Sequence, residues 1–137
     1  MELIQNQKDR IFLAGSGGMV GSAIKRSLIN LGYGKDPYTY NLLTPSKEEL
    51  NLLDEFSVKN WFKQNQPTIV ILAAAKVGGI IANSNYPADF LIENIKIQTN
   101  VIESSWTNGI KRLLFLGSSC IYPKYASQPI QEEALLK

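Results

Sequence analysis

A glycine-rich segment follows directly on the apolar run Ile11–Ala14 and reads Gly15-Ser16-Gly17-Gly18-Met19-Val20-Gly21. A continuous apolar run is typical of a central strand that is covered on both faces. After the glycines, apolar residues recur at helical spacing, at Val20, Ala23, Ile24, Leu28 and Leu31. Glycines between a strand and a helix let backbone N–H groups approach a phosphate at the start of the helix. The segment therefore predicts a phosphate-binding turn, with a merely structural turn as the alternative.

Short apolar runs alternate with longer helical patterns along the chain, which is typical of βαβ units and a parallel sheet. Further strands are predicted over Tyr38–Leu43, Thr68–Ala75 and Arg112–Leu116, with a short apolar piece at Leu50–Leu53. No repeat or linker divides the chain, so we expect one domain over residues 1–137. The predicted fold is α/β, a Rossmann-type doubly wound parallel sheet of about five strands that ends before its far edge.

Two more helices are predicted beyond the first. Asp54 is placed to cap a helix over Glu55–Asn65, which Pro67 ends and which carries Val58, Trp61 and Phe62 on one side. A glycine-containing loop, Lys76–Asn85, then leads to Pro87, a residue that suits the first turn of a helix. The helix that begins at Pro87 is long and runs to Asn108.

The long helix carries two apolar stripes. One is formed by Leu91, Ile95, Ile102 and Trp106, and the other by Phe90, Ile97 and Val101. One stripe can cover the sheet. The other either widens the burial within the domain or, as we favour for a domain this small, forms a face for another subunit.

Composition excludes several classes of protein. The 137 residues include 14 basic and 12 acidic side chains without a basic run, so nucleic acid is not an expected partner. No apolar run approaches the ~20 residues of a membrane span, and residues 1–10 do not resemble a signal peptide. A single cysteine fits a reducing, cytoplasmic location. Without histidine, no zinc or iron site is expected.

The end of the second predicted strand bears on the choice of cofactor. Enzymes that use NAD usually place an Asp or Glu there, which binds the ribose 2′-hydroxyl. Here the stretch has no acid and reads Asn41-Leu42-Leu43-Thr44-Pro45-Ser46-Lys47. A carboxylate would repel a 2′-phosphate, whereas Ser46 and Lys47 can bind one. NADP (NADPH) is therefore favoured over NAD, with a solvated surface lysine as the alternative for Lys47.

Two more segments follow predicted strands, at the edge where open α/β sheets bind ligands. Small side chains at Ala73, Ala74 and Ala75 would let the ribose of a nicotinamide come close, although such a strand end is often only tight packing. In the second segment, Ser118 can hydrogen-bond a substrate carbonyl, or it can form a turn with Ser119. Cys120 is either a thiol beside a substrate carbon or a small buried hydrophobic residue.

Five segments carry a resemblance to a known family: Gly15–Ser22 (GSGGMVGS), Glu49–Asp54 (ELNLLD), Ala73–Ile80 (AAAKVGGI), Tyr86–Phe90 (YPADF) and Leu113–Lys124 (LLFLGSSCIYPK). Together they resemble the GDP-L-fucose synthase family of extended short-chain dehydrogenase/reductases. The resemblance runs in chain order over essentially all of the sequence. The segments AAAKVGGI and GSSCIYPK are distinctive of this family within its superfamily.

The resemblance implies an activity and a set of site residues. Members epimerise two carbons beside the keto group of GDP-4-keto-6-deoxy-mannose and then reduce the ketone with NADPH. The implied partner is therefore a GDP-linked sugar. The second apolar stripe of the Pro87–Asn108 helix separately favours a homodimer through that helix. Matched residue by residue, Ser118 would orient the keto oxygen, and Cys120 would exchange protons at the epimerised carbons. Asn51 and Leu52 would contact the adenine.

The chain also departs from the family pattern. It has Ser16-Gly17 where the family commonly carries a basic residue, and it lacks an arginine near Pro45. None of its six tyrosines has a lysine four residues further on, so the family's Tyr-x-x-x-Lys pair is missing. The histidine that partners the epimerising cysteine is missing too.

We therefore expect an incomplete nucleotide-binding domain that lacks the sugar-binding C-terminal domain and is inactive as an isolated chain. Two alternatives stay open. The chain could be a module that binds NADP(H) without chemistry, or a subunit that completes itself by pairing with a second chain. The segments AAAKVGGI and SSCIYP argue against a different nucleotide-sugar epimerase or dehydratase.

Overall fold

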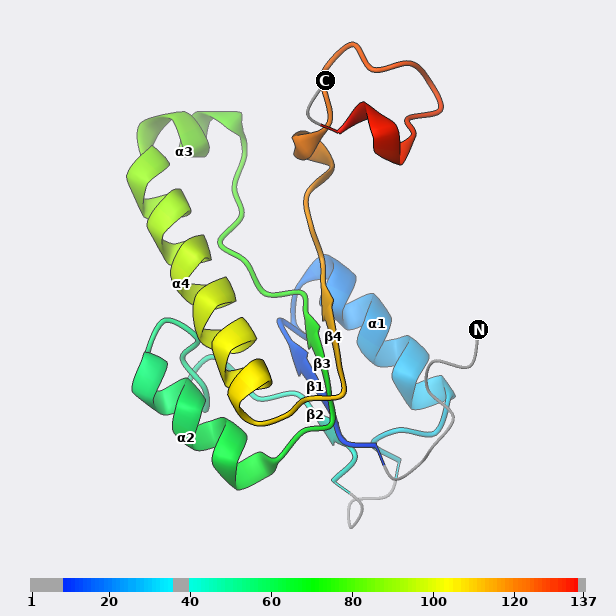
Figure 1. Ribbon diagram of the computed structural model, residues 1–137, viewed down its shortest axis with the longest axis vertical. Helices are drawn as coiled ribbons and strands as arrows, with labels where there is room; N and C mark the ends of the chain where they lie inside the picture. Colours follow the sequence, from blue (N-terminus) through cyan, green and yellow to red (C-terminus); the bar gives the residue numbers. More distant parts are fainter. Residues whose placement is uncertain (1–8, 36–39, 136–137) are drawn as a thin grey trace.

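The computed structural model describes residues 9–35 and 40–135, which contain a four-stranded parallel sheet (Figure 1). The strands lie in the order β2-β1-β3-β4, and their bounds are β1 Ile11–Ala14, β2 Leu42–Leu43, β3 Ile69–Leu72 and β4 Arg112–Phe115. β1, β3 and β4 pair in register over all four residues, so they end at one common edge. From β1 the chain goes to β2 on one side, and β3 lies on the other. The order of the strands therefore reverses at the carboxyl ends of β1 and β3.

Helices cover both faces of the sheet. α1 (Met19–Asn30) lies on one face, and α2 (Glu55–Asn65) and α4 (Pro87–Thr107) lie on the other (Figure 1). Three short pieces complete the fold: the helix α3 (Ile80–Asn85) and the 3₁₀ turns η1 (Ser119–Ile121) and η2 (Glu132–Ala134). The doubly wound parallel architecture expected from the sequence is confirmed. The described residues form four strands, against about five expected.

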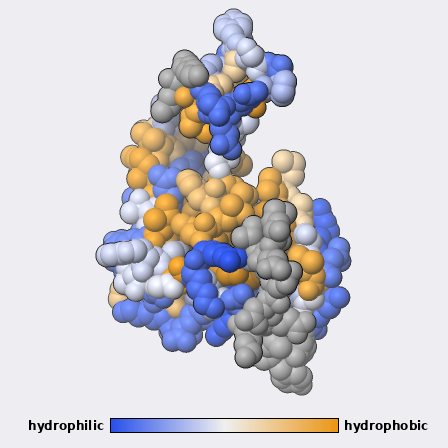
Figure 2. Space-filling model, turned by 45° about the vertical axis from the view of Figure 1, so that its right-hand side comes forward, coloured by the Kyte–Doolittle hydropathy of each residue, from blue (hydrophilic) through white to orange (hydrophobic). Residues whose placement is uncertain are grey.

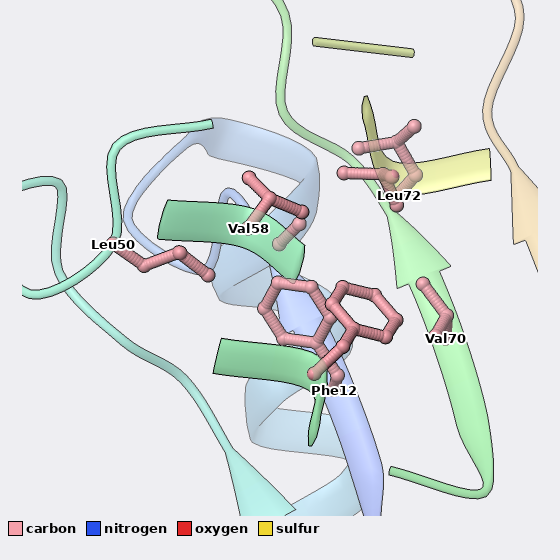
Figure 3. Close-up of a cluster of buried hydrophobic side chains, with 8 residues drawn as sticks. Phe12, Leu50, Val58, Val70 and Leu72 are labelled. Carbon is pink, nitrogen blue, oxygen red and sulfur yellow. The ribbon is translucent and has the colours of Figure 1, made fainter. Parts of the chain in front are cut away.

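Side chains of β1 alternate between two separate hydrophobic clusters. Phe12 and Ala14 pack with α2 and α4, whereas Ile11 and Leu13 pack with Leu28 of α1. The first cluster contains Phe12, Ala14, Leu50, Val58, Phe62, Val70, Leu72 and Val101 (Figure 3). An aromatic contact lies at its centre, where the Phe12 ring is 4.5 Å from Trp61 and 5.6 Å from Phe62 between ring centroids.

The two long helices on this face match their predicted extents. The Asp54 carboxylate caps α2 by accepting a hydrogen bond from Phe56 N at 3.1 Å. A hydrogen bond from the Ser57 hydroxyl is the main cause that lowers the pKa of Asp54. In α4, Val101 is fully buried and Ile97 is half-buried against the core. The other predicted stripe is exposed and consists of Leu91, Ile95, Ile102 and Trp106.

Three predicted elements differ from the observed ones. The strand Tyr38–Leu43 is reduced to Leu42–Leu43, because Tyr40 has a φ of 44° and leaves the extended conformation; residues 38 and 39 lie outside the described part. The strand Thr68–Ala75 ends at Leu72, beyond which Ala73 to Gly79 form a loop. The predicted loop Lys76–Asn85 contains α3, whose first turn is held by the Asn83 amide donating to the Gly78 and Gly79 carbonyls.

The last strand of the sheet lies at an edge. All four residues of β4 are exposed, and Leu116 adds one more ladder bond to Leu72. Figure 2 shows hydrophobic surface gathered between the body of the domain and the C-terminal segment. Within the described ranges, no helix is long and apolar enough to cross a membrane.

Candidate functional site

Two glycines allow the turn after β1 to pack closely against its surroundings. Gly15 has a φ of 84°, and a Cβ there would lie 2.7 Å from the Ala74 Cα. A Cβ on Gly21, one turn into α1, would lie 2.0 Å from the Gly15 carbonyl oxygen. By contrast, a Cβ on Gly17 would meet nothing within 4 Å. Gly15 and Gly21 are therefore required by packing, and Gly17 faces open space.

The start of α1 is open to an anion. Gly18 is the N-cap and supplies no side-chain hydrogen bond, and the first turn contains no acidic residue. The side chain of Met19 is 87% exposed, and Gly17 and Gly18 are exposed as well. The first N–H groups of a helix lack partners within the helix, and its dipole places positive charge there. The turn therefore presents the arrangement that binds phosphate groups.

The strand end Ala73–Ala75 lies directly beside this turn. Ala73 N donates to Ala14 O at 3.0 Å, which continues the pairing of β3 with β1. Ala73 and Ala74 are half-buried and Ala75 is exposed. The structure thus brings together the glycine turn and the alanines, at the point where the order of the strands reverses. Ligands of open α/β sheets bind at such a point.

The loop after β2 carries the residues predicted to bind a 2′-phosphate. Ser46 and Glu49 form a capping pair, because Ser46 N donates to the Glu49 carboxylate at 2.7 Å and Glu49 N donates to the Ser46 hydroxyl at 3.3 Å. Lys47 is exposed on this turn. The pKa of the Glu48 carboxylate is lowered, first by a hydrogen bond from the backbone N–H of Glu48 and then by one from the Ser46 hydroxyl. Lys47 therefore shares the turn with two carboxylates, which weaken its positive field.

Asn51 and Leu52, expected near the adenine, form the next turn. The Asn51 side chain accepts from Leu53 N at 3.1 Å, and the Leu52 carbonyl accepts from the Asn100 amide at 2.9 Å. Asn51 is exposed, and Leu52 packs partly against the core. Asn100 lies on α4 and is 8% exposed, so this turn is tied to the long helix.

Ser118 and Cys120 follow β4 at the same edge of the sheet. The Ser118 hydroxyl oxygen accepts a hydrogen bond from Cys120 N at 3.1 Å and so caps the 3₁₀ turn η1. The turn-forming role of this serine is therefore observed. Cys120 is free and exposed, so the interpretation of this residue as a buried hydrophobic side chain is wrong. The reason is that η1 turns away from the sheet and leaves both side chains in solvent.

Sequence reasoning missed the residues that hold the loop after β3. The Asn94 amide bonds Lys76 twice: Lys76 N donates to Asn94 Oδ1 at 2.8 Å, and Asn94 Nδ2 donates to Lys76 O at 2.9 Å. The Lys76 ammonium pairs with Glu93 at 2.5 Å. The helix carries many other polar residues, so neither Asn94 nor Asn100 stands out in the sequence as a signal for this contact. A hollow lined by residues from Pro123 to Ala134 contains none of the residues of this site.

Comparison with known proteins gives one family. The model of the NAD dependent epimerase/dehydratase family matches residues 11–137. GDP-L-fucose synthase 1 of Arabidopsis thaliana is 53% identical over 97% of the chain, and GDP-L-fucose synthase of Escherichia coli is 49% identical over 95%. Each match covers 39% of the relative, so the chain spans about two fifths of the length of these proteins.

A solved structure also matches nearly all of this chain and only part of its own length. A GDP-mannoheptose C4 reductase from Campylobacter jejuni with NADP bound matches with a TM-score of 0.85 and 35% identity. That match covers 97% of the chain and 40% of the reductase.

Proposed function

The chain belongs to the NAD dependent epimerase/dehydratase family, and we propose that its glycine turn binds the pyrophosphate of NADP(H). The observation that carries the proposal is the start of α1, which has no side-chain cap and lies where the order of the strands reverses. Gly15 and Gly21 pack so closely there that neither position has room for a Cβ atom. Backbone N–H groups of Gly17 and of the first turn of α1, Met19 to Gly21, would bind the phosphates, whereas Gly18 N donates to the Gly15 carbonyl. Ala73–Ala75 would lie beside the nicotinamide ribose, and Asn51 and Leu52 beside the adenine.

NADP is proposed over NAD because no carboxylate lies at the end of β2. The residues from Asn41 to Pro45 include no carboxylate that would bind a ribose 2′-hydroxyl or repel a 2′-phosphate. Ser46 and Lys47 are the exposed groups that would bind the phosphate. The C. jejuni reductase with NADP bound shares 35% identity and supports the same choice.

For a protein that contains this chain together with the rest of the length of its relatives, we propose an epimerase/reductase that acts on a GDP-linked keto-deoxy-sugar. The cofactor would supply a hydride for reduction of the ketone. Protons beside a ketone are acidic enough for a thiolate to remove when the enolate oxygen is stabilised. The exposed Cys120 thiol would exchange those protons. Ser118 accepts a hydrogen bond from Cys120 N through its oxygen, which leaves the Ser118 hydroxyl hydrogen available for the keto oxygen.

The 137-residue chain by itself is expected to bind the cofactor without turning over substrate. It holds Ser118 and Cys120, but it contains no Tyr-x-x-x-Lys pair to donate the proton in reduction and no histidine to partner the cysteine. The nucleotide-sugar activity is therefore proposed for a protein that includes these residues.

Calorimetry with NADPH and NADH tests this proposal. We expect micromolar binding of NADPH and binding of NADH about tenfold weaker, because a charge-assisted hydrogen bond to the 2′-phosphate contributes roughly 1.5–3 kcal/mol. Lys47→Ala should weaken the binding of NADPH and leave the affinity for NADH unchanged. With GDP-4-keto-6-deoxy-mannose added, NADPH absorbance should stay constant. Equal affinity for the two cofactors would refute the NADP assignment, and normal turnover would refute the inactivity of the chain.

A second proposal concerns the exposed stripe of α4, which we propose as a pairing surface for another copy of the chain. The stripe is formed by Leu91, Ile95, Ile102 and Trp106, whose exposures are 62%, 45%, 40% and 82%. A contiguous apolar face of this kind marks an interaction site in a small domain.

Sedimentation equilibrium is expected to give a dimer for this chain. Leu91→Lys should weaken the dimer by at least about tenfold, because association would then bury an unpaired charge. Phe56→Lys is the matched control, since Phe56 is 74% exposed and lies on α2, outside the stripe. A monomeric wild-type chain, or equal effects of the two substitutions, would rule out this surface.

A further inference from the structure

Helix α4 fastens two loops that lie at different ends of the proposed cofactor site. Through Asn94 it holds the loop after β3, because both polar atoms of the Asn94 amide bond the backbone of Lys76. Through Asn100 it holds the turn before α2, because the Asn100 amide bonds Leu52 O. The two asparagines are six positions apart on one helix, so a single rigid element sets the position of both loops.

The loop after β3 depends on α4 for its shape. Residues 73 to 79 belong to no helix or strand, so few of their backbone groups are satisfied by regular structure. Asn94 supplies partners for both the N–H and the C=O of Lys76 across 18 positions of sequence. Two further observations show that the loop lies close to α4. The Lys76 ammonium is 5.3 Å from the Phe90 ring centroid, and Gly78 is so near this ring that a Cβ atom on it would lie 2.8 Å from Phe90 Cζ.

The two loops lie on opposite sides of the reversal in strand order. A dinucleotide bound at such a point spans the crevice, with its adenosine half on the side of β1 and β2. The turn that holds Leu52 follows β2, and the loop that holds Lys76 follows β3. The second loop is therefore placed to face the nicotinamide half.

We propose that Asn94 is a positioning residue that holds the loop after β3 against the nicotinamide half of NADP(H). Asn100 holds the turn at Leu52, which would contact the adenosine half. The inference rests on the proposed function, since it requires that the chain bind NADP(H). Asn94 acts through the Lys76 backbone and itself has no contact with the cofactor in this proposal. Loss of the Asn94 amide would free the loop and weaken the binding of only those ligands that carry a nicotinamide.

Two ligands distinguish binding of the two halves of the cofactor: NADPH, and adenosine 2′,5′-bisphosphate, which lacks the nicotinamide, its ribose and the phosphate attached to that ribose. Dissociation constants for both are measured by calorimetry on the wild-type chain, on Asn94→Ala and on the matched control Asn100→Ala. The readout is the ratio of the NADPH constant to the bisphosphate constant. Partial unfolding raises both apparent constants by the same factor and leaves the ratio unchanged, so a general loss of stability does not imitate the effect.

Asn94→Ala is expected to raise the ratio about tenfold, since two hydrogen bonds that order the loop are lost. Asn100→Ala is expected to weaken both ligands together and to leave the ratio at the wild-type value. Asn94→Asp keeps the oxygen that accepts from Lys76 N and loses the donor to Lys76 O. It should therefore give an intermediate ratio, and it carries the test where the alanine variant does not fold.

The failures of the two proposals are distinguishable. A wild-type chain that binds neither ligand would overturn the proposed function and this inference with it. A wild-type chain that binds both, with an unchanged ratio in the Asn94 variants, would overturn the inference alone. A raised ratio in Asn100→Ala that equals that of Asn94→Ala would overturn the division of roles between the two asparagines.

Discussion

Gly21→Ala should destabilise the chain by about 3 kcal/mol and abolish detectable NADPH binding. The added methyl group would lie 2.0 Å from the Gly15 carbonyl oxygen and 2.7 Å from its carbonyl carbon. Both neighbours are backbone atoms, so no side chain can rotate away. Relief requires that α1 or the glycine turn move, and either movement displaces the N–H groups proposed to bind phosphate. Urea unfolding and calorimetry with NADPH measure the two effects.

Gly17→Ala is the matched control for this substitution. A Cβ at Gly17 has nothing within 4 Å, and Gly17 is not among the glycines with a positive φ. Its free energy of unfolding should therefore stay within about 0.5 kcal/mol of wild type. If Gly21→Ala and Gly17→Ala unfold at the same urea concentration, the close approach of α1 to the turn is not what constrains Gly21.

Phe62→Ala is the substitution in the core with the largest expected effect, about 3–5 kcal/mol of unfolding free energy. Phe62 is fully buried on α2, and its ring meets Phe12 at 5.6 Å and Trp61 at 5.7 Å between centroids. Its loss would leave a cavity between α2 and β1. Domains have roughly 5–15 kcal/mol of total stability, so this substitution should remove a large part of it and lower the urea concentration at which the chain unfolds.

Phe56→Ala tests whether burial causes this effect. Phe56 lies on the same helix and is 74% exposed, so its truncation removes the same atoms without making a cavity. A change below about 0.5 kcal/mol is expected, measured by urea denaturation followed by circular dichroism. Similar losses for the two substitutions would mean that α2 does not pack on the sheet through Phe62.

The sequence predicts those elements whose signals are local. β1 is a continuous apolar run, α2 begins after a capping aspartate, and α4 begins at Pro87. Each signal acts within a few residues, so its outcome does not depend on distant parts of the chain. The parallel sheet also follows, since helical stretches between buried strands require crossovers. The position of the glycine turn at the start of α1 could be predicted for the same reason.

Other features depend on contacts between segments far apart in sequence. The length of the second strand is set at Tyr40, whose φ is positive, and no neighbouring residue signals this. The role of Asn94 arises only when α4 is docked beside the loop after β3, which brings together residues 18 positions apart. Likewise, the exposure of Cys120 depends on the direction that η1 takes after β4. Such features follow from packing and could not be predicted from periodicity.

The two tryptophans of the chain lie in different surroundings, which gives the molecule two separate fluorescent probes. Trp61 lies on α2 and packs against Phe12 at the edge of the core, so its emission reports whether the domain is folded. Trp106 is 82% exposed at the end of the apolar stripe on α4, so a quencher dissolved in water reaches it unless that stripe is covered. Folding and self-association can therefore be followed in the same sample without any added label.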